Sequence, residues 1–198
     1  MQYKSNIAVF ASGSGTNASN LIDYFSNAET AIVSLVLTNK PDAPVIRRAT
    51  ERMTDVTVFD REQLYGSEYI NNLLLERGVD FIALAGFLWL VPDNIIASYR
   101  GRIVNIHPAL LPAYGGRGMY GNHVHRAVLK NGEKESGITI HYVNEKYDEG
   151  DIIFQARCEV KSDDTVASLT ARIHQLEHRY YPGVVEKVLL GEEPPFKF

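Results

Sequence analysis

The first 107 residues of this chain contain a series of short apolar runs, and this series constrains the fold more than any other feature. In order, the runs cover residues 6–11, 31–38, 56–59, 81–85 and 103–107. Between them, apolar residues recur at helical spacing in the segments 18–25, 45–52, 69–77 and 92–99. Strands that are apolar on both faces and alternate with helices are typical of a parallel sheet covered on both sides. The sequence therefore predicts a doubly wound, mostly parallel α/β sheet with helices on both faces.

The chain after this series follows a different pattern. Residues 108–122 are rich in glycine and contain two prolines, which predicts a loop. A helix is expected over 123–130. Two segments, 136–143 and 151–160, then read as strands joined by a short acidic turn. They predict an antiparallel addition at the C-terminal side of the sheet.

A long final helix is expected from Thr165, with capping residues at 162–164 before it. Pro182 is expected to kink or break this helix, because proline removes one helical hydrogen bond. No internal repeat or low-complexity linker divides the chain, so the sequence predicts a single domain over residues 1–198.

Charge and composition argue against several classes of protein. The net charge is −4 and there is no run of Lys and Arg, which disfavours a nucleic-acid surface. Cys158 is the only cysteine, so neither an intrachain disulfide nor a cysteine-based zinc site is expected, and it reads as an ordinary strand residue. The first residues show no signal peptide, and no window approaches the roughly 20 apolar residues of a membrane span. We expect a cytoplasmic monomer or homodimer with small-molecule partners and no nucleic acid or membrane.

A glycine turn follows the first expected strand. The backbone N–H groups of residues 13–17 and the start of the next helix can bind an anion. Gly13, Gly15 and Ala18 also fit a dinucleotide fingerprint loosely, but that motif needs an acidic residue after the second strand, where Asn39 and Lys40 stand. A phosphate monoester therefore fits better than NAD. The alternative is a turn that needs glycine only for its geometry.

Asn105 and His107 are two apart in the strand that Pro108 ends, so their side chains share a face at its C-terminal tip. In open α/β sheets, ligands bind at that edge. An amide can donate to an oxygen that gains negative charge, and an imidazole can move a proton near neutral pH. Asp148, in the acidic turn, is either a turn residue or the carboxylate that orients His107, and spacing does not decide between the two.

The other histidines give weaker signals. His123 and His125 lie at the start of a predicted helix beside the glycine-rich loop, and His141 lies on a predicted strand. His174 and His178 are four apart on the last helix, a spacing that can bind zinc, but Glu177 is not in the position found in zinc proteases. The sequence therefore predicts no metal.

Several motifs together resemble one family. They are Ser12-Gly13-Ser14-Gly15-Thr16-Asn17, Leu84-Ala85-Gly86-Phe87, Asn105-Ile106-His107-Pro108 with Leu110-Leu111-Pro112, Asp148-Glu149-Gly150 and Leu176-Glu177-His178. In this order they are similar to the phosphoribosylglycinamide formyltransferases, folate-dependent enzymes of purine biosynthesis. The similarity runs from about residue 6 to about residue 185.

The resemblance implies a role for each motif. The implied catalytic residues are Asn105, His107 and Asp148. The implied ribonucleotide-binding residues are Gly13, Ser14, Gly15, Thr16, Asn17, His174, Gln175 and Glu177. The implied formylfolate-binding residues are Arg61, Leu88, Trp89, Leu90, Val91, Asn105, Asn144, Glu145, Lys146, Tyr147 and Asp148. The N-terminal half would then bind phosphate and the C-terminal half formylfolate, with 10-formyltetrahydrofolate as co-substrate.

The resemblance also implies a mechanism. The amine of 5-phosphoribosylglycinamide attacks the formyl carbon directly, and Asn105 and protonated His107 stabilise the negative oxygen of the tetrahedral intermediate. Asp148 is expected to raise the pKa of His107 through its opposite charge.

Two departures and three alternatives remain. Trp89 stands where the family commonly has Arg, and the loop 114–122, with Arg117, is longer than usual. Methionyl-tRNA formyltransferase and formyltetrahydrofolate hydrolase are disfavoured, because each is expected to have an additional domain. A non-catalytic nucleotide-binding domain is the alternative from a different class.

Overall fold

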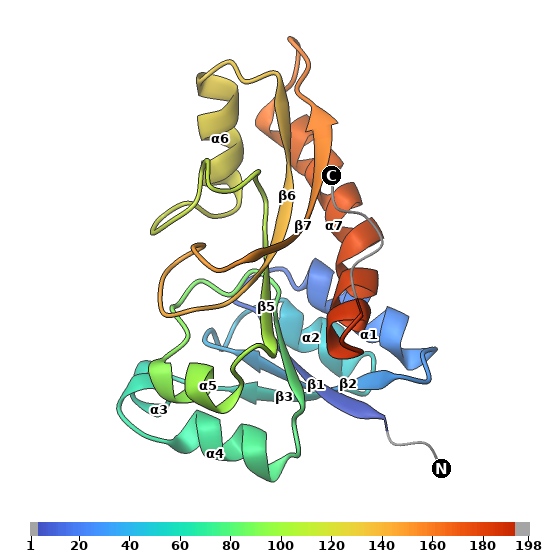
Figure 1. Cartoon of the computed structure of the whole chain (residues 1–198), viewed down its shortest axis with the longest axis vertical. Coiled ribbons are helices and arrows are strands. Elements are labelled where there is room, and N and C mark those ends of the chain that lie inside the picture. The colour runs from blue at the N-terminus through green and yellow to red at the C-terminus, as the bar shows by residue number, and fades with distance from the viewer. Residues whose placement is uncertain (1–3, 193–198) are drawn as a thin grey trace.

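The computed structural model describes residues 4–192. Its single seven-stranded sheet has the order β3-β2-β1-β4-β5-β6-β7 (Figure 1). The strands are β1 (Ser5–Phe10), β2 (Ala31–Thr38), β3 (Asp55–Val58), β4 (Phe81–Leu84), β5 (Ile103–His107), β6 (Glu135–Tyr142) and β7 (Ile152–Glu159). β1 to β5 are parallel, and β6 and β7 are added antiparallel. The predicted fold class is confirmed.

Helices cover both faces of this sheet (Figure 1). They are α1 (Thr16–Ser26), α2 (Val45–Thr50), α3 (Arg61–Tyr65), α4 (Tyr69–Glu76), α5 (Asp93–Ser98), α6 (Asn122–Lys130) and α7 (Val166–Leu189). Successive side chains of β1 enter separate cores: Ile7 and Val9 pack with residues of α1, α2, α6 and α7, whereas Ala8 and Phe10 pack with residues of α3, α4 and α5. Within residues 4–192, the structure contains no helix with both the length and the apolar character needed to cross a membrane.

The last helix corrects the expected N-cap and the expected break at Pro182. Its N-cap is Thr165 itself, whose side chain accepts a hydrogen bond from the Ser168 N–H, rather than the preceding residues 162–164. The helix also continues through Pro182 to Leu189. Proline cannot donate to the carbonyl four residues earlier, but Asn20 Nδ2 of α1 donates to that His178 oxygen at 2.9 Å. The neighbouring helix therefore satisfies the group that the proline leaves free.

The sequence did not indicate α3, which has only five residues. It begins with a capping box, in which Asp60 accepts from the Gln63 N–H and the Gln63 side chain accepts from the Asp60 N–H. The strand order reverses between β1 and β4, and their C-terminal ends lie at the same edge of the sheet. This edge is where open α/β sheets bind ligands, and it carries the polar side chains described next.

Candidate active site

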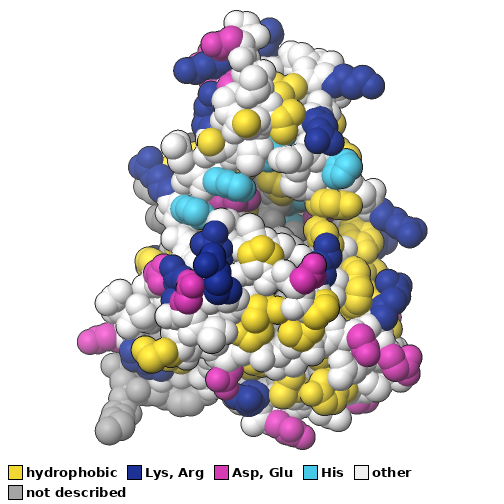
Figure 2. All heavy atoms as spheres, turned by 180° about the vertical axis from the view of Figure 1, so that it is seen from behind, with side chains coloured by type: hydrophobic (Ala, Val, Ile, Leu, Met, Phe, Trp, Pro, Cys, Tyr) yellow, Lys and Arg dark blue, Asp and Glu magenta, His cyan; other side chains and the backbone are white. Residues whose placement is uncertain are grey.

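A cavity of about 910 Å³ opens at the C-terminal edge of β1, β4 and β5. In the space-filling view it is the hollow in the middle of the molecule, with histidine side chains at its rim (Figure 2). Its lining comes from residues 12–17, 85–90, 105–108, 116–122 and 147–148, from Lys40, Arg61, Tyr65 and His125, and from Thr170, His174 and Glu177 of α7. Segments far apart in the sequence therefore meet around one space.

The glycine turn forms one end of this cavity. Gly15 is the N-cap of α1 and adopts a left-handed conformation, with φ of 76° and ψ of 20°. No side chain caps this helix, so the N–H groups of its first turn are available to a ligand. Together with the positive end of the helix dipole, they suit an anion.

Gly15→Ala is expected to destabilise the fold by about 2–4 kcal/mol. An added Cβ would lie 2.5–2.7 Å from three atoms of Val45, and φ is positive at this position. The matched control is Gly13→Ala, because a Cβ at Gly13 meets no atom within 4 Å. Urea unfolding of both variants measures the difference, and equal stabilities would contradict the expected packing.

A buried polar pair lies beside the turn. Asn17 Nδ2 donates to Glu177 Oε2 at 2.9 Å, and Glu177 is only 6 % exposed. Burial raises the pKa of Glu177 to about 7, although the hydrogen bond from Asn17 opposes this effect. Asn17 Oδ1 has no partner among the described residues, and His174 Nε2 lies 3.9 Å from Glu177 Oε2. Together, the side chains of Asn17, Glu177 and His174 can both donate and accept hydrogen bonds, as ligand hydroxyl groups require.

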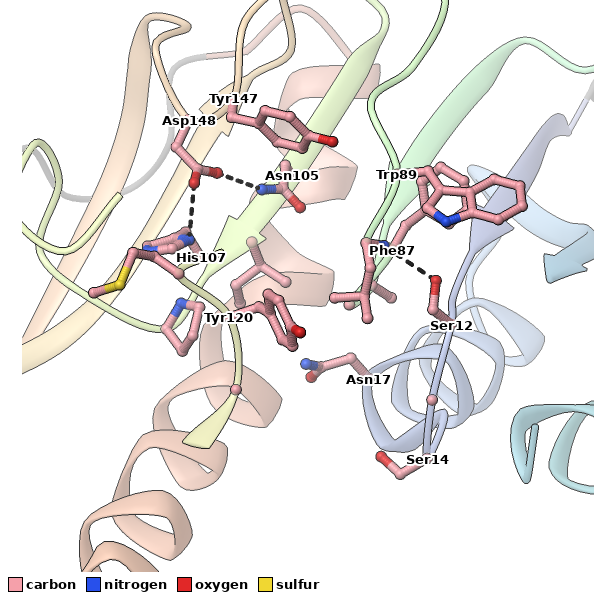
Figure 3. Close-up of a pocket in the computed structure, with 18 of the residues that line it drawn as sticks. Ser12, Ser14, Asn17, Phe87, Trp89, Asn105, His107, Tyr120, Tyr147 and Asp148 are labelled. Carbon is pink, nitrogen blue, oxygen red and sulfur yellow. Dashed lines mark hydrogen bonds and ion pairs between the residues drawn. The ribbon is translucent and has the colours of Figure 1, made fainter. Parts of the chain in front are cut away.

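His107 lies at the tip of β5, near the middle of the cavity (Figure 3). Its Nε2 donates to the Tyr114 carbonyl at 2.8 Å, and its Nδ1 lies 3.5 Å from Asp148 Oδ2. Burial lowers the pKa of His107 and outweighs the opposing effects of Asp148 and the Tyr114 carbonyl. Asp148 therefore acts on the histidine in the expected direction, but the net pKa in the free protein lies below the ordinary value.

Asp148 occupies a strained position, with φ of 56°. The Gly116 N–H of the glycine-rich loop donates to its Oδ2 at 2.9 Å. Burial raises the pKa of Asp148, but the neighbouring His141 and His107 and the Gly116 N–H lower it by more, so the side chain is ionised near neutral pH. One carboxylate thus contacts the loop and both of these histidines.

Asn105 lies beside Asp148 and directs its amide nitrogen toward that carboxylate (Figure 3). Its Nδ2 lies 3.1 Å from His141 Nε2 and donates to Asp148 Oδ1 at 3.4 Å. His141 is the residue opposite Asn105 in the β5–β6 ladder. The amide nitrogen of Asn105 thus contacts both a histidine and the carboxylate of Asp148.

Aromatic side chains form the other end of the cavity. Arg61 lies over the rings of Tyr65 and Trp89, at 5.1 and 5.4 Å from their centroids. Trp89 also contacts Phe59 and Phe87, with centroids 6.2 and 6.5 Å apart. Such a wall suits a flat aromatic ligand, and the guanidinium suits a carboxylate.

The comparisons with known proteins agree with this geometry. The family model described as Formyl transferase matches residues 5–185. The chain belongs to the formyl transferase family. The resemblance read from the motifs is thereby confirmed.

Curated relatives of this chain include single-activity and trifunctional proteins. The chain is 36 % identical to the phosphoribosylglycinamide formyltransferase of Bacillus subtilis, over 92 % of this chain and 93 % of that protein. It is 40 % identical to the chloroplastic phosphoribosylglycinamide formyltransferase of Arabidopsis thaliana. The match covers 92 % of this chain and 64 % of that protein. It spans only 14 % of a trifunctional purine biosynthetic protein of Drosophila melanogaster, at 39 % identity over 96 % of this chain.

Solved structures of the family superpose well on this chain. The phosphoribosylglycinamide formyltransferase of Bacillus halodurans matches with a TM-score of 0.83 and 37 % identity, over 93 % of this chain and 95 % of that one. A glycinamide ribonucleotide transformylase of Symbiobacterium toebii matches with a TM-score of 0.87 and 34 % identity, over 96 % and 90 % of the two chains.

Most of the catalytic and substrate-binding residues implied by the resemblance lie on the cavity wall. The exceptions are Val91, which is buried in the core with α4 and α5, and Asn144, Glu145, Lys146 and Gln175, which lie outside the lining. The lining also includes residues that sequence reasoning did not assign: Ser12, Lys40, Tyr65, Tyr120, His125 and Thr170. Of these, Ser12 carried a signal, because it opens the glycine motif, and His125 carried a weaker one beside the glycine-rich loop.

Ser12 connects the two ends of the cavity. Its Oγ donates to Asn39 Oδ1 at 2.6 Å and accepts from the Leu88 N–H at 3.1 Å (Figure 3). Its own N–H donates to the Gly86 carbonyl. The glycine turn and the 86–90 segment are therefore fixed to one another.

Proposed function

We propose that this chain transfers the formyl group of 10-formyltetrahydrofolate to the amine of 5-phosphoribosylglycinamide, a step of de novo purine biosynthesis. One observation carries the proposal: His107 and Asp148 meet in the middle of a cavity that has an anion-binding turn at one end and an aromatic wall with Arg61 at the other. Two small molecules placed from opposite ends would have their reacting groups beside this pair. The phosphate site would then come from the N-terminal half of the single domain, and the formylfolate site from residues 61–90 together with the turn at 147–148 in the C-terminal half.

The glycine turn is the proposed phosphate site of the ribonucleotide. Residues 13–17 offer N–H groups at the start of α1, and Lys40 lies in the same lining. Glu177 and Asn17, with His174 one turn before Glu177 on α7, suit the ribose hydroxyls. The amine of the substrate would then point toward His107.

The aromatic wall is the proposed formylfolate site. The segment 88–90 and the turn residues Tyr147 and Asp148, which line the cavity, would border the pteridine. Arg61 would face the carboxylate end of the folate. Trp89, where an Arg is common, supplies a ring rather than a second cation.

The chemistry needs no covalent enzyme intermediate, because the formyl donor is already activated. The amine nitrogen forms a bond to the formyl carbon, and the carbonyl electrons move onto the oxygen. Protonated His107 donates from Nδ1 to that oxygen, and the developing negative charge favours the protonated ring over the neutral one. The tetrahedral intermediate then breaks its bond to the folate nitrogen, which takes up the proton released by the amine through water near Asp148. Positioning two substrates side by side makes a large contribution.

The test is an assay with the purified chain, 10-formyltetrahydrofolate and 5-phosphoribosylglycinamide, followed by mass spectrometry of the products. We expect formylated ribonucleotide and tetrahydrofolate in equal amounts. Free formate without formylated ribonucleotide would indicate a hydrolase instead. Neither product, together with tight binding of NAD in a titration, would indicate a non-catalytic nucleotide-binding domain.

A further inference from the structure

Thr139 and Gln155 lie in one row with His107 across the neighbouring strands β5, β6 and β7 (Figure 1). Thr139 is the residue opposite His107 in the β5–β6 ladder, and Gln155 is opposite Thr139 in the β6–β7 ladder. Opposite residues of an antiparallel pair project their side chains from the same face of the sheet. Thr139 is fully buried and Gln155 partly buried, and neither is among the residues that line the cavity. Both can therefore act on a ligand only through other residues.

These two side chains bind the start of the loop that follows His107. The Leu111 N–H donates to Thr139 Oγ1 at 3.0 Å, and Thr139 Oγ1 donates to the Ala109 carbonyl at 2.6 Å. Gln155 Nε2 donates to the Leu111 carbonyl at 3.0 Å and to Thr139 Oγ1 at 2.9 Å. Side chains of two strands thus hold both backbone polar groups of Leu111 and the carbonyl of Ala109.

The backbone groups in this network fix which atom donates in each bond. A carbonyl oxygen can only accept and an N–H can only donate, so the Thr139 hydroxyl gives its hydrogen to Ala109 and accepts from Leu111. The end of Gln155 that faces the Leu111 carbonyl must for the same reason be the amide nitrogen. Its other hydrogen then goes to the second lone pair of Thr139 Oγ1. The hydroxyl thereby uses its full capacity of one donated and two accepted hydrogen bonds.

Side-chain packing connects the same part of the loop to Asp148. A Cβ at Gly115 would lie 2.6 Å from Leu111 Cδ2 and 3.3 Å from Asp148 Cβ, so the loop backbone fits closely between these two side chains. A Cβ at Gly137 of β6 would lie 2.7 Å from Leu110 Cδ2, so this strand also fits closely against the loop. A displacement at the start of the loop would therefore reach Gly115 and its neighbours.

The next residues of the loop hold His107 and Asp148. The Tyr114 carbonyl accepts from His107 Nε2 at 2.8 Å, and the Gly116 N–H donates to Asp148 Oδ2 at 2.9 Å. Because a carbonyl oxygen can only accept, Tyr114 keeps a proton on Nε2. Nδ1, which lies 3.5 Å from Asp148 Oδ2, is then the nitrogen that gains and loses a proton. The position of the loop therefore determines how the imidazole is presented to the cavity.

We propose that Thr139 and Gln155 are positioning residues: they hold the loop 109–116 in place, so that Tyr114 keeps a proton on His107 Nε2 and leaves Nδ1 for the formyl oxygen. The inference rests on the proposed function. A shift of about 1 Å in a catalytic group, caused by a change at a distance from it, can lower a rate roughly 100-fold. The two side chains would thus support the rate through geometry, without contact with either substrate.

The first test compares Thr139→Val with Thr139→Ser. Valine resembles threonine in shape but has no hydroxyl for Ala109 and Leu111, whereas serine keeps the hydroxyl. We expect Thr139→Val to lower kcat about 10- to 100-fold with little change in the KM of either substrate, and Thr139→Ser to recover most of that loss. The control is Ser136→Ala: Ser136 Oγ is buried on the same strand and has no partner within the described part of the chain, so kcat should stay unchanged.

The second test observes the His107 ring directly. Burial lowers the pKa of His107, so the ring is neutral at neutral pH, and two-bond ¹H–¹⁵N spectra of the labelled protein then distinguish its tautomers. We expect a proton on Nε2 in the wild-type protein and a mixture of both tautomers in Thr139→Val. Gln155→Leu removes two hydrogen bonds of the network and should change kcat and the tautomer in the same direction, by less. It replaces Thr139→Val in both tests if that variant does not fold.

The outcomes separate the inference from the function on which it rests. Unchanged kcat in the folded hydroxyl-free variant, equal losses in Thr139→Val and Thr139→Ser, or an unchanged His107 tautomer overturns the positioning role while the wild-type protein still transfers formyl groups. No transfer by the wild-type protein overturns the proposed function instead, and the catalytic part of the inference with it. A lower kcat at constant KM, recovery by serine and mixed tautomers together support the inference.

Discussion

His107→Ala is expected to lower kcat by roughly 10²–10³-fold, the usual cost of removing one donor to a developing oxyanion. The imidazole is placed for this task by the Tyr114 carbonyl at Nε2, which leaves Nδ1 on the side of Asp148 and the cavity. The KM of the ribonucleotide should change little, because the proposed phosphate and ribose contacts come from α1 and α7. Steady-state kinetics with each substrate varied in turn measures both constants.

The control variant removes a histidine from α7, the helix that carries the proposed ribose contacts. His178 lies on α7, and its side chain is not part of the cavity lining, so His178→Ala should keep nearly full turnover. Thermal unfolding of both variants checks that a loss of rate is not a loss of fold, since His107 is buried. Turnover of a folded His107→Ala within a few-fold of wild type would remove His107 from the mechanism.

The architecture could be predicted because the central parallel strands β1 and β4 are buried on both faces along most or all of their length and read as apolar runs. What the sequence could not supply were features decided by contacts between distant segments. Helix α7 continues through Pro182 because Asn20 of α1 satisfies the freed carbonyl. Helix α3 is too short for a periodic pattern and depends on the capping box of Asp60 and Gln63.

The candidate site also combines features that the sequence predicts with features that depend on contacts between distant segments. Strand periodicity alone places Asn105 and His107 on one face, and the proline after them marks the strand end. It cannot show that His141 lies opposite Asn105, because antiparallel register depends on how β6 pairs with β5. The contact between His141 and Asn105 therefore had to be read from the structure, as did the balance of burial against Asp148 at His107.

The second large effect is expected at Glu177, as a dependence of stability on pH. Burial raises its pKa from the usual 4.5 to about 7 in the folded protein, so the folded state binds the proton more tightly than the unfolded chain. Burial of the carboxylate costs more free energy than burial of the protonated carboxyl. Stability should therefore fall as pH rises through the interval between these values. The interval corresponds to roughly 3 kcal/mol.

Glu177→Gln removes the titration and keeps an oxygen to accept from Asn17 Nδ2. The variant should thus gain stability relative to wild type as pH rises, by roughly 3 kcal/mol between about pH 4 and about pH 8. Urea unfolding of the two proteins across that range measures the gap, with Glu76→Gln on the exposed end of α4 as the control for loss of a carboxyl. A gap that stays constant with pH would mean that Glu177 enters the folded protein at no electrostatic cost. Because the carboxyl faces the cavity, the stability lost by keeping it there is consistent with selection for a ligand contact rather than for folding.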